Sequence, residues 1–424
     1  MMNNYKGKKL LILAGANVHV KLVEEAKELG VYTIVTDFLE PEHSPAKLIA
    51  DEYWMLNVTD VDGIVERCRQ EHVDGVIAGW IDVCQIPYCQ ICHDLNLPCY
   101  GSSDLFFKFT NKHAFKDTCK AYGVGTILEY TKKDALSGSI DYPVFVKPVD
   151  SRGSRGQSIC NSSADLSHAI AFAEEESSNG DIIIEKYLAD KNSFQVTYLF
   201  ADGIPYVLRT ADGYKGLVDD KLDKVALCSV SPSIYTDEYM RTTHPLVIEM
   251  MKREGLENGP FMLQGFYDDG TFRFYDPGLR FPGVDFDIIY RNLFGVSVMA
   301  MMVEFALTGK MLPEENLTNY NVFLKGGSAA VLFPTIAAGK LAVLEGMDAV
   351  GALESVHSVT LRHLVGDNVP WSYNVNQRLA EINVFSDNKE DLKKQIQNIY
   401  SLIDVRDEEN RNMLYKPFDV NRID

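Results

Sequence analysis

Apolar segments of strand length alternate with segments of helical pattern along the first 100 residues, and this alternation restricts the fold more than any other feature. Strands are expected at 9–14, 31–35, 53–56 and 73–78, and helices at 20–29, 61–71 and 82–95. Strands that alternate with helices form a parallel sheet covered by helices. Gly15 and Gly79 each follow a strand, at the edge where open α/β sheets bind ligands. The sequence therefore predicts an α/β domain over residues 1–109.

A dinucleotide-binding domain is an alternative for this first section. Asp37 lies about 20 residues after Gly15, where an acid that binds a ribose would stand. The turn reads AGANVHVK, however, and has one glycine in place of the G-x-G-x-x-G pattern. The backbone then has less room for a pyrophosphate, so a nicotinamide-dependent oxidoreductase is disfavoured.

The composition excludes several classes of partner. The 424 residues, a length that suggests about three domains, include 41 basic and 60 acidic side chains, a net charge of −19. Nucleic acid is not expected as a partner, because phosphate backbones are bound by clustered lysine and arginine. No membrane association is expected, since no run approaches 18 apolar residues. Lysines precede the apolar run at 10–14 as in a signal peptide, but a first β-strand explains the run better.

Three of the eight cysteines, Cys84, Cys89 and Cys92, have a C-x4-C-x2-C spacing that is similar to an iron–sulfur run. Two of them, Cys84 and Cys92, also recur at helical spacing with Tyr88 and Leu95, which favours one buried stripe of a helix. The other cysteines are scattered, as in a reduced cytoplasmic protein.

The pattern changes after residue 109 towards an α+β arrangement. Helices are expected from Thr110 and at 163–176, 292–307 and 389–403, and strands at 142–147, 157–160, 181–186, 193–200, 204–209, 260–267, 271–275, 329–333 and 378–384. The turns ADG and DDG are typical of hairpins, so the later strands are expected to be antiparallel. The predicted division is a central region at 110–325, with a lid at about 124–187, and a separate C-terminal α+β unit at 326–424.

The segment YPVFVKPVDSRGSRGQSI places Lys147 at the end of an apolar strand, before a loop rich in glycine and serine. Backbone amides beside glycines form an anion-binding nest, and a lysine can reach phosphate oxygens. The candidate phosphate-binding residues of the loop are Ser151, Arg152, Gly153, Ser154 and Gly156. A flexible basic hairpin is the alternative, and the chain has no G-x4-G-K-[ST] and therefore no P-loop.

Two further segments carry polar groups at strand ends. In DIIIEKYL a buried strand delivers Glu185, and the backbone that follows can pair with an adenine edge, although an ordinary strand end is the alternative. In FMLQGFYDDGTFRFYDPGLRFPG, Gln264 and Asp276 stand at comparable distances from the turn, on opposite arms of a hairpin. Both can therefore point to one face. Mg²⁺ prefers oxygen ligands, usually one or two carboxylates with phosphate oxygens and water, so the hairpin can supply a minimal metal site.

The order of these segments resembles the ATP-grasp superfamily, which includes biotin carboxylase, the carbamoyl-phosphate synthetase large chain, purine-pathway carboxylases and D-alanine–D-alanine ligase. The matching features are a helix with Lys112, a strand with Lys147 before the Gly/Ser loop, a strand ending in Glu-Lys-Tyr-Leu, and the hairpin with Gln264, Asp276 and Arg280. The resemblance covers nearly the whole chain. It implies an ATP-grasp fold with a preceding α/β domain and a small C-terminal domain.

The resemblance implies a role for each candidate residue. Lys112 and Lys147 would bind ATP phosphates beneath the Gly/Ser loop. Glu185 would contact the adenine through its side chain, and Lys186 and Leu188 would do so through the backbone.

The resemblance also assigns a reacting centre, in which Gln264 and Asp276 would hold Mg²⁺ and Arg280 would be the catalytic residue. The implied reaction has two steps: a carboxylate attacks the γ-phosphate of ATP, and an amine or thiol then displaces phosphate from the acyl phosphate. Arg280 would face the acyl phosphate and the tetrahedral species that follows. The implied partners are a small carboxylate and a small amine, and a homodimer is compatible with the resemblance.

Gly278 departs from the Glu-x-Asn-x-Arg pattern of the family, because it takes the place of the asparagine. The acid is Asp276 in place of glutamate, and Gln264 replaces another glutamate. Either a second metal is weak or absent, or Asp268 or Asp285 compensates. A nucleotide-binding homologue without ligase turnover is therefore the alternative to a ligase.

Overall fold

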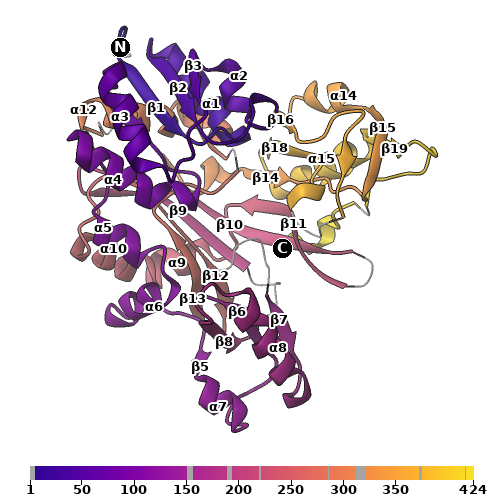
Figure 1. Ribbon diagram of the computed structural model, residues 1–424. Helices are drawn as coiled ribbons and strands as arrows, with labels where there is room; N and C mark the ends of the chain where they lie inside the picture. The colour runs from indigo at the N-terminus through magenta and orange to yellow at the C-terminus, as the bar shows by residue number, and fades with distance from the viewer. Residues whose placement is uncertain are drawn as a thin grey trace.

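The computed structural model describes residues 5–149, 156–188, 193–218, 221–284, 286–311, 317, 320–371, 375–415 and 417–424. Figure 1 shows the N-terminal elements at the top, a small lid at the bottom and the C-terminal elements at the right, around a central set of long strands. This mixture of a parallel sheet and antiparallel sheets confirms the predicted fold class.

The N-terminal section is a parallel sheet of order β3-β2-β1-β4. Its elements are β1 (Lys9–Leu13), α1 (Asn17–Glu28), β2 (Tyr32–Thr36), α2 (Pro45–Ile49), β3 (Glu52–Trp54), α3 (Val61–Glu71), β4 (Gly75–Ile77) and α4 (Gln85–Leu95). The predicted α/β alternation is confirmed. Cys84 and Cys92 are buried, as their helical spacing predicted, and Cys89 is buried as well.

Two helices, α5 (Ser103–Lys108) and α6 (Lys112–Ala121), lead from this sheet to the lid. The second begins at Lys112 and not at Thr110, because the Asn111 side chain accepts hydrogen bonds from the amides of His113 and Ala114 and so caps the helix. This cap places Lys112 in the first turn.

The lid is a sheet of order β5-β8-β6-β7. Its elements are β5 (Glu129–Tyr130), α7 (Lys132–Leu136), β6 (Val144–Pro148), β7 (Ser158–Cys160), α8 (Ser163–Glu176) and β8 (Ile182–Lys186). A separate apolar core joins Val144 and Val146 of the sheet to Leu166 and Ile170 of α8. The lid therefore has its own packing and is joined to the rest of the molecule at its edges.

The central sheet has eight strands in the order β13-β12-β9-β10-β11-β14-β18-β16. The strands of this sheet that precede residue 326 in the chain are β9 (Ser193–Ala201), β10 (Ile204–Val218), β11 (Lys221–Ser231), β12 (Gly259–Asp268) and β13 (Thr271–Gly278). The expected strand at 204–209 is longer, and β11 and the helices α9 (Thr236–Thr242) and α10 (His244–Arg253) were not predicted. Asp212, Gly213 and Gly216 are poor strand formers, so ladder pairing with neighbours holds β10 extended.

The single helix expected at 292–307 is wrong, because two helices, α11 (Asp287–Phe294) and α12 (Val298–Thr308), meet at 96°. Gly295 has a φ of 71°, which ends α11, and Ser297 caps α12 by accepting from the Ala300 amide. The second helix packs on β4 so closely that a Cβ at Gly75 would lie 2.5 Å from the Ala306 carbonyl oxygen. Within the described ranges no single helix is long and apolar enough to cross a membrane. The bent pair of α11 and α12 meets that limit only when the two helices are taken together.

The tail contributes both to the central sheet and to a second core. Its elements are β14 (Ser328–Leu332), β15 (Gly339–Glu345), α14 (Met347–Gly351), β16 (Val356–Leu361), β17 (Asn368–Val369), β18 (Ala380–Ser386), α15 (Lys389–Leu402) and β19 (Asp404–Asp407). β14 pairs with β11, so the tail strands extend the central sheet. The residues 326–424 were expected to be a separate unit; they have a largely separate apolar core but share a sheet.

Candidate functional site

Gln264 of β12 and Asp276 of β13 are directly paired across their hairpin, and directly paired residues point to one face. Gln195 of β9 pairs with Gln264 on its other side, so one row of the sheet carries three polar side chains. In the described part of the chain, no group of three or more His, Cys, Asp or Glu residues could hold a metal ion. One carboxylate and one amide oxygen fit a Mg²⁺ ion that phosphate oxygens and water also coordinate.

The carboxylate of Asp276 is half-buried, and it makes no hydrogen bond or ion pair with the described residues. Burial raises the pKa of Asp276, whereas Arg280, Lys112 and Lys147 act to lower it and Asp82 acts to raise it. The three cations come from α6, β6 and the loop after β13. Charged groups from separate segments therefore converge on one carboxylate, as expected of a site for a metal and an anionic ligand.

Arg280 links this centre to the N-terminal domain. Its guanidinium forms an ion pair with Asp82, which follows β4, and also lies 3.4 Å from Met262 Sδ. The same loop is held by the Phe281 amide, which donates to the Gly79 carbonyl at 2.6 Å, and by Tyr100 Oη, which donates to the Leu279 carbonyl at 3.0 Å. These contacts fix Arg280 at the carboxyl edge of the parallel sheet.

Gly278 packs against the stem of Arg280. A Cβ at this position would lie 3.0 Å from Arg280 Cγ and 3.3 Å from Arg280 Nε. These separations are tighter than ordinary van der Waals contacts, so the stem of Arg280 would have to shift by a few tenths of an ångström to admit a Cβ here. Gly278, which stands where the family pattern has a metal-binding asparagine, therefore also makes room for Arg280.

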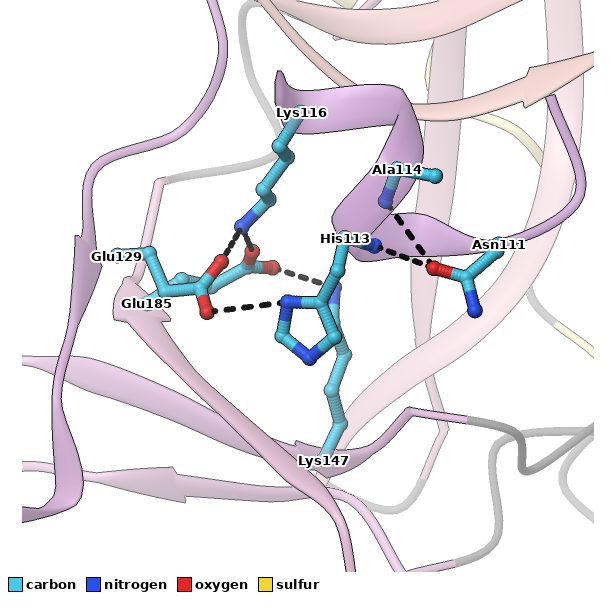
Figure 2. Close-up of polar contacts among 7 residues, drawn as sticks. All are labelled: Asn111, His113, Ala114, Lys116, Glu129, Lys147 and Glu185. Carbon is cyan, nitrogen blue, oxygen red and sulfur yellow. Dashed lines mark hydrogen bonds and ion pairs between the residues drawn. The ribbon is translucent and has the colours of Figure 1, made fainter. Parts of the chain in front are cut away.

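Glu185 accepts from two lysines, as Figure 2 shows. Lys147 Nζ lies 2.5 Å from one carboxylate oxygen, and Lys116 Nζ lies 3.0 Å from the other. Lys116 also reaches Glu129 at 2.6 Å. Burial would raise the pKa of Glu185, but Lys147 and Lys116 together hold it below its usual range. The side chain of Glu185 was predicted to contact the adenine, and in this structure both of its carboxylate oxygens are bound to lysines.

Only some of the residues that were predicted to bind phosphate lie in the described part of the chain. Lys112 Nζ donates to the Val149 carbonyl at 2.8 Å, which brings it to the start of the Gly/Ser loop. Gly156 has a φ of 69°, and a Cβ there would lie 2.6 Å from Pro148 Cγ. Ser151, Arg152, Gly153 and Ser154 lie outside the described residues, as does Asp285.

Leu188 lies in a small apolar cluster with Ile127, Phe266 and Tyr275, where the lid meets the central sheet. Lys186 has a half-exposed side chain 3.9 Å from Asp268, and its amide donates to the Leu128 carbonyl at 2.9 Å. An apolar surface beside a polar strand end suits a planar base. The roles of Lys186 and Leu188 stay predictions.

Asp37, the candidate for binding a ribose, is part of a buried network of hydrogen bonds. It accepts hydrogen bonds from the Gly15 amide at 2.9 Å and from Ser44 Oγ at 2.7 Å, and it pairs with the buried ammonium of Lys47 at 3.0 Å. A Cβ at Gly15 would lie 2.0 Å from Ser44 Oγ. The place where a pyrophosphate would approach is thus filled by the protein itself.

Sequence reasoning missed three polar residues of the centre, namely Lys116, Glu129 and Asp82. Lys116 stands four residues after Lys112 and so faces the same side of α6, a spacing that could have revealed it. Asp82 follows a parallel strand, where functional groups gather. Glu129 had no comparable signal, because its place depends on the pairing of β5 with β8.

Sequence comparison supports an ATP-binding region in this part of the chain. The family described as the carbamoyl-phosphate synthase L chain, ATP binding domain, matches residues 112–202. Biotin carboxylase 1 of Bacillus subtilis is 23% identical over 212 residues, 45% of this chain and 47% of that protein. The formate-dependent phosphoribosylglycinamide formyltransferase of the same species is 28% identical over 201 residues, 43% and 49% respectively. The chain thus spans about half the length of the curated relatives it matches.

Solved structures match over nearly the full chain. Phosphoribosylglycinamide synthetase from Anaerococcus prevotii has a TM-score of 0.74 at 18% identity, covering 95% of this chain and 100% of that one. L-amino acid ligase from Bacillus licheniformis also has a TM-score of 0.74 at 18% identity, covering 96% and 100%. Residues 112–202 are thus similar to the carbamoyl-phosphate synthase L chain, ATP binding domain, and the whole chain shares the fold of these ligases and synthetases.

Proposed function

We propose that this protein is an ATP- and Mg²⁺-dependent ligase that activates a carboxylate as an acyl phosphate and transfers the acyl group to an amine or thiol. The observation that carries the proposal is that Lys112, Lys147 and Arg280, from three separate segments, lie near enough to Asp276 to act on its pKa. Phosphoryl transfer depends on positioning and on neutralising phosphate charge, which such a group of cations can provide. The names of the relatives, among them biotin carboxylase and L-amino acid ligase, support a reaction of this class.

Each residue would act through its charge and position. Bound MgATP would supply the phosphoryl group. Gln264 and Asp276 would hold the metal, and Lys112 and Lys147 would neutralise phosphate oxygens. Arg280, held by Asp82, would donate N–H groups to the oxygen that gains charge when the acyl carbon becomes tetrahedral.

The lid would exclude water from the acyl phosphate. The network of Lys116, Glu129 and Glu185 ties α6 to the lid sheet. Because Glu185 also binds Lys147, it would orient this ammonium towards the phosphates. The network would thereby couple the position of the lid to the position of a phosphate ligand.

A homologue that binds nucleotide without turnover is the second candidate function. Gly278 favours it, because an oxygen ligand of the family pattern is absent from this position. The placement of Arg280 between Asp82 and Met262 supports the ligase, since a guanidinium that is held in place can stabilise charge on a tetrahedral oxygen. Homodimer formation also stays a prediction, which a molar mass from light scattering would test.

Phosphate release tests the proposal. The protein would be incubated with MgATP and pairs drawn from a panel of small carboxylates, amino acids and thiols. Release that needs both members of a pair, together with a coupled product seen by mass spectrometry, supports the ligase. Tight ATP binding with no release for any pair supports the second candidate and overturns the first.

A further inference from the structure

The two edges of the N-terminal parallel sheet differ in how they are covered. At one edge, α12 packs on β4 so closely that a Cβ at Gly75 would lie 2.5 Å from the Ala306 carbonyl oxygen. At the other edge, β3 pairs with β2 on one side, and no strand of the described residues pairs with its outer side. Figure 1 shows β3 at the top of the molecule. An uncovered edge strand is a template for pairing with another chain.

The backbone of Tyr53, the middle residue of β3, faces away from the sheet. The Thr33 carbonyl accepts a hydrogen bond from the Asp51 amide at 3.1 Å, so the odd-numbered residues of β2 direct their backbone groups towards β3. Tyr53 pairs with Val35, which is one of these residues. In a parallel ladder only one member of each opposed pair bonds to the other strand, so the amide and carbonyl of Tyr53 point outwards.

An apolar patch lies beside this edge. Its side chains are between 38% and 65% exposed and belong to Leu39, Leu48, Tyr53 and Met55. They gather around the ammonium of Lys47, which lies 2.5 Å from the Leu39 carbonyl oxygen, 3.1 Å from Met55 Sδ and 5.6 Å from the centre of the Tyr53 ring. Because contiguous exposed apolar surface marks a contact site, this patch indicates a protein partner.

The polar groups beside the strand are complementary to a second copy of themselves. Glu52 Oε1 accepts from Trp54 Nε1 at 2.7 Å and lies 3.4 Å from Arg67 Nη2, and the Arg67 guanidinium lies over the Trp54 ring. In an antiparallel pair of two β3 strands centred on Tyr53, Glu52 of one copy stands directly opposite Trp54 of the other. Each Glu52 then lies beside the Arg67 of the other copy as well as its own. An open groove between β3 and α3, lined by Trp54 and Arg67, leaves this side of the strand accessible.

We propose that β3 is the contact of a two-fold symmetric homodimer, in which the two N-terminal sheets join into one continuous sheet. The outward amide and carbonyl of Tyr53 form a reciprocal pair of hydrogen bonds with Tyr53 of the second copy, and the apolar patches lie beside these bonds. A two-fold dimer places one surface against its own copy. The backbone groups, the apolar patch and the ion pairs of this edge are all self-complementary, which favours a second copy over a different partner. The inference concerns assembly and does not depend on the proposed ligase activity.

The molar mass in solution tests this contact. At about 50 µM protein, well above the Kd of a stable interface of standard size, the wild type should have twice the mass of one chain by light scattering. Tyr53→Asp and Tyr53→Lys should each be monomeric, because two like charges would be directly opposed on the symmetry axis. The matched controls Leu364→Asp and Leu364→Lys change an exposed apolar residue of the C-terminal unit and should stay dimeric.

An equimolar mixture of Tyr53→Asp and Tyr53→Lys gives the sharpest result. In a two-fold contact each Tyr53 faces Tyr53 of the other chain, so the two monomeric variants should combine into a dimer that holds one chain of each. Native mass spectrometry of chains that carry tags of different mass would identify this mixed dimer. Its formation would also show that neither substitution prevents folding.

Three results would overturn the proposal. A wild type that is monomeric at this concentration excludes the dimer. Dimeric Tyr53→Asp and Tyr53→Lys place the contact elsewhere on the surface, and a mixture of the two that stays monomeric shows that the two copies of Tyr53 do not face each other. All of these masses are measured without ATP, so the assembly and the ligase activity fail separately.

Discussion

Asp37 and Asp276 are two partly or fully buried carboxylates at strand ends, yet their surroundings differ in one decisive respect. The protein itself fills the hydrogen-bonding capacity of Asp37, through Gly15, Ser44 and Lys47. Asp276 has no such donors within the described residues, although three cations lie close enough to shift its pKa. The first carboxylate stabilises the fold, and the second is open to a ligand.

The comparison shows that sequence spacing alone cannot identify a functional acid. Asp37 stands at the distance from Gly15 that a ribose-binding acid requires, but its carboxylate is bound by Lys47 of α2 and by Ser44, which precedes α2. A charged group with a perturbed pKa and no protein partner is a better sign of function, because a fold does not retain an unfavourable group without a use for it.

The largest expected effect is on activity, from Asp276→Asn. Removing the only carboxylate of the paired metal residues should lower kcat/KM about 1,000-fold, or roughly 4 kcal/mol. The free energy of unfolding should change by less than about 1 kcal/mol, since no hydrogen bond is lost. Steady-state phosphate release and urea unfolding would measure the two quantities.

Asp269→Asn is the matched control, because Asp269 is exposed at the tip of the same hairpin. Its activity and stability should equal those of the wild type. Full activity of Asp276→Asn would show that Asp276 does not bind the metal, and the functional difference between Asp276 and Asp37 would then be wrong.

Asp37→Asn should produce the opposite pattern. It leaves the fully buried ammonium of Lys47 without a counter-charge, so the free energy of unfolding should fall by about 3 kcal/mol. The folded fraction should keep its kcat/KM. Urea unfolding measures the first quantity, and activity normalised to folded protein measures the second. Asp62→Asn, an exposed acid of α3, should change neither; a selective loss of activity in Asp37→Asn would show that the acid contacts substrate.

Glu185 sharpens the comparison, because it is paired like Asp37 but lies beside the proposed phosphate ligands. Its pKa is depressed in the folded protein, so its contribution to stability is present above the unfolded value of about 4.3 and is lost as pH falls through the folded value. Glu185→Gln should therefore lower the free energy of unfolding by about 2 kcal/mol at pH 7, and the difference from wild type should shrink below about pH 4.3. A difference that does not vary with pH would show that packing, and not charge, accounts for the loss.

The fold was predictable where local pattern and tertiary structure agree. The parallel sheet follows from short apolar strands such as β1, in which every residue after Lys9 is buried. The strands β6 and β8 and the β12–β13 hairpin were expected close to their observed bounds. The strand β10 was cut short, because Asp212, Gly213 and Gly216 give no strand signal by themselves, and its partner β11 was missed. The single expected helix failed at Gly295, whose left-handed conformation allows a sharp turn that apolar periodicity does not reveal.

The site was predictable only within single hairpins and helices. The pairing of Gln264 with Asp276 could be counted from one turn, whereas the contact of Arg280 with Asp82 joins segments that are 198 residues apart. Gln195 lies beside Gln264 through a strand register, which no local pattern specifies. Long-range register, and not residue type, therefore limits what the sequence reveals about this centre.

The smallest expected effect tests whether the surroundings of Asp276 depend on the shape of Gly278. In Gly278→Ala the added Cβ would lie 3.0 Å from Arg280 Cγ, so the guanidinium should shift away from the reacting centre. We expect kcat/KM to fall about 10-fold, or roughly 1.4 kcal/mol, with ATP affinity unchanged. Gly283→Ala is the control, because a Cβ there would meet no atom within 4 Å. An unchanged kcat/KM in Gly278→Ala would mean that Arg280 tolerates displacement, and its catalytic role would then be wrong; a loss of ATP affinity would instead place the guanidinium against the nucleotide.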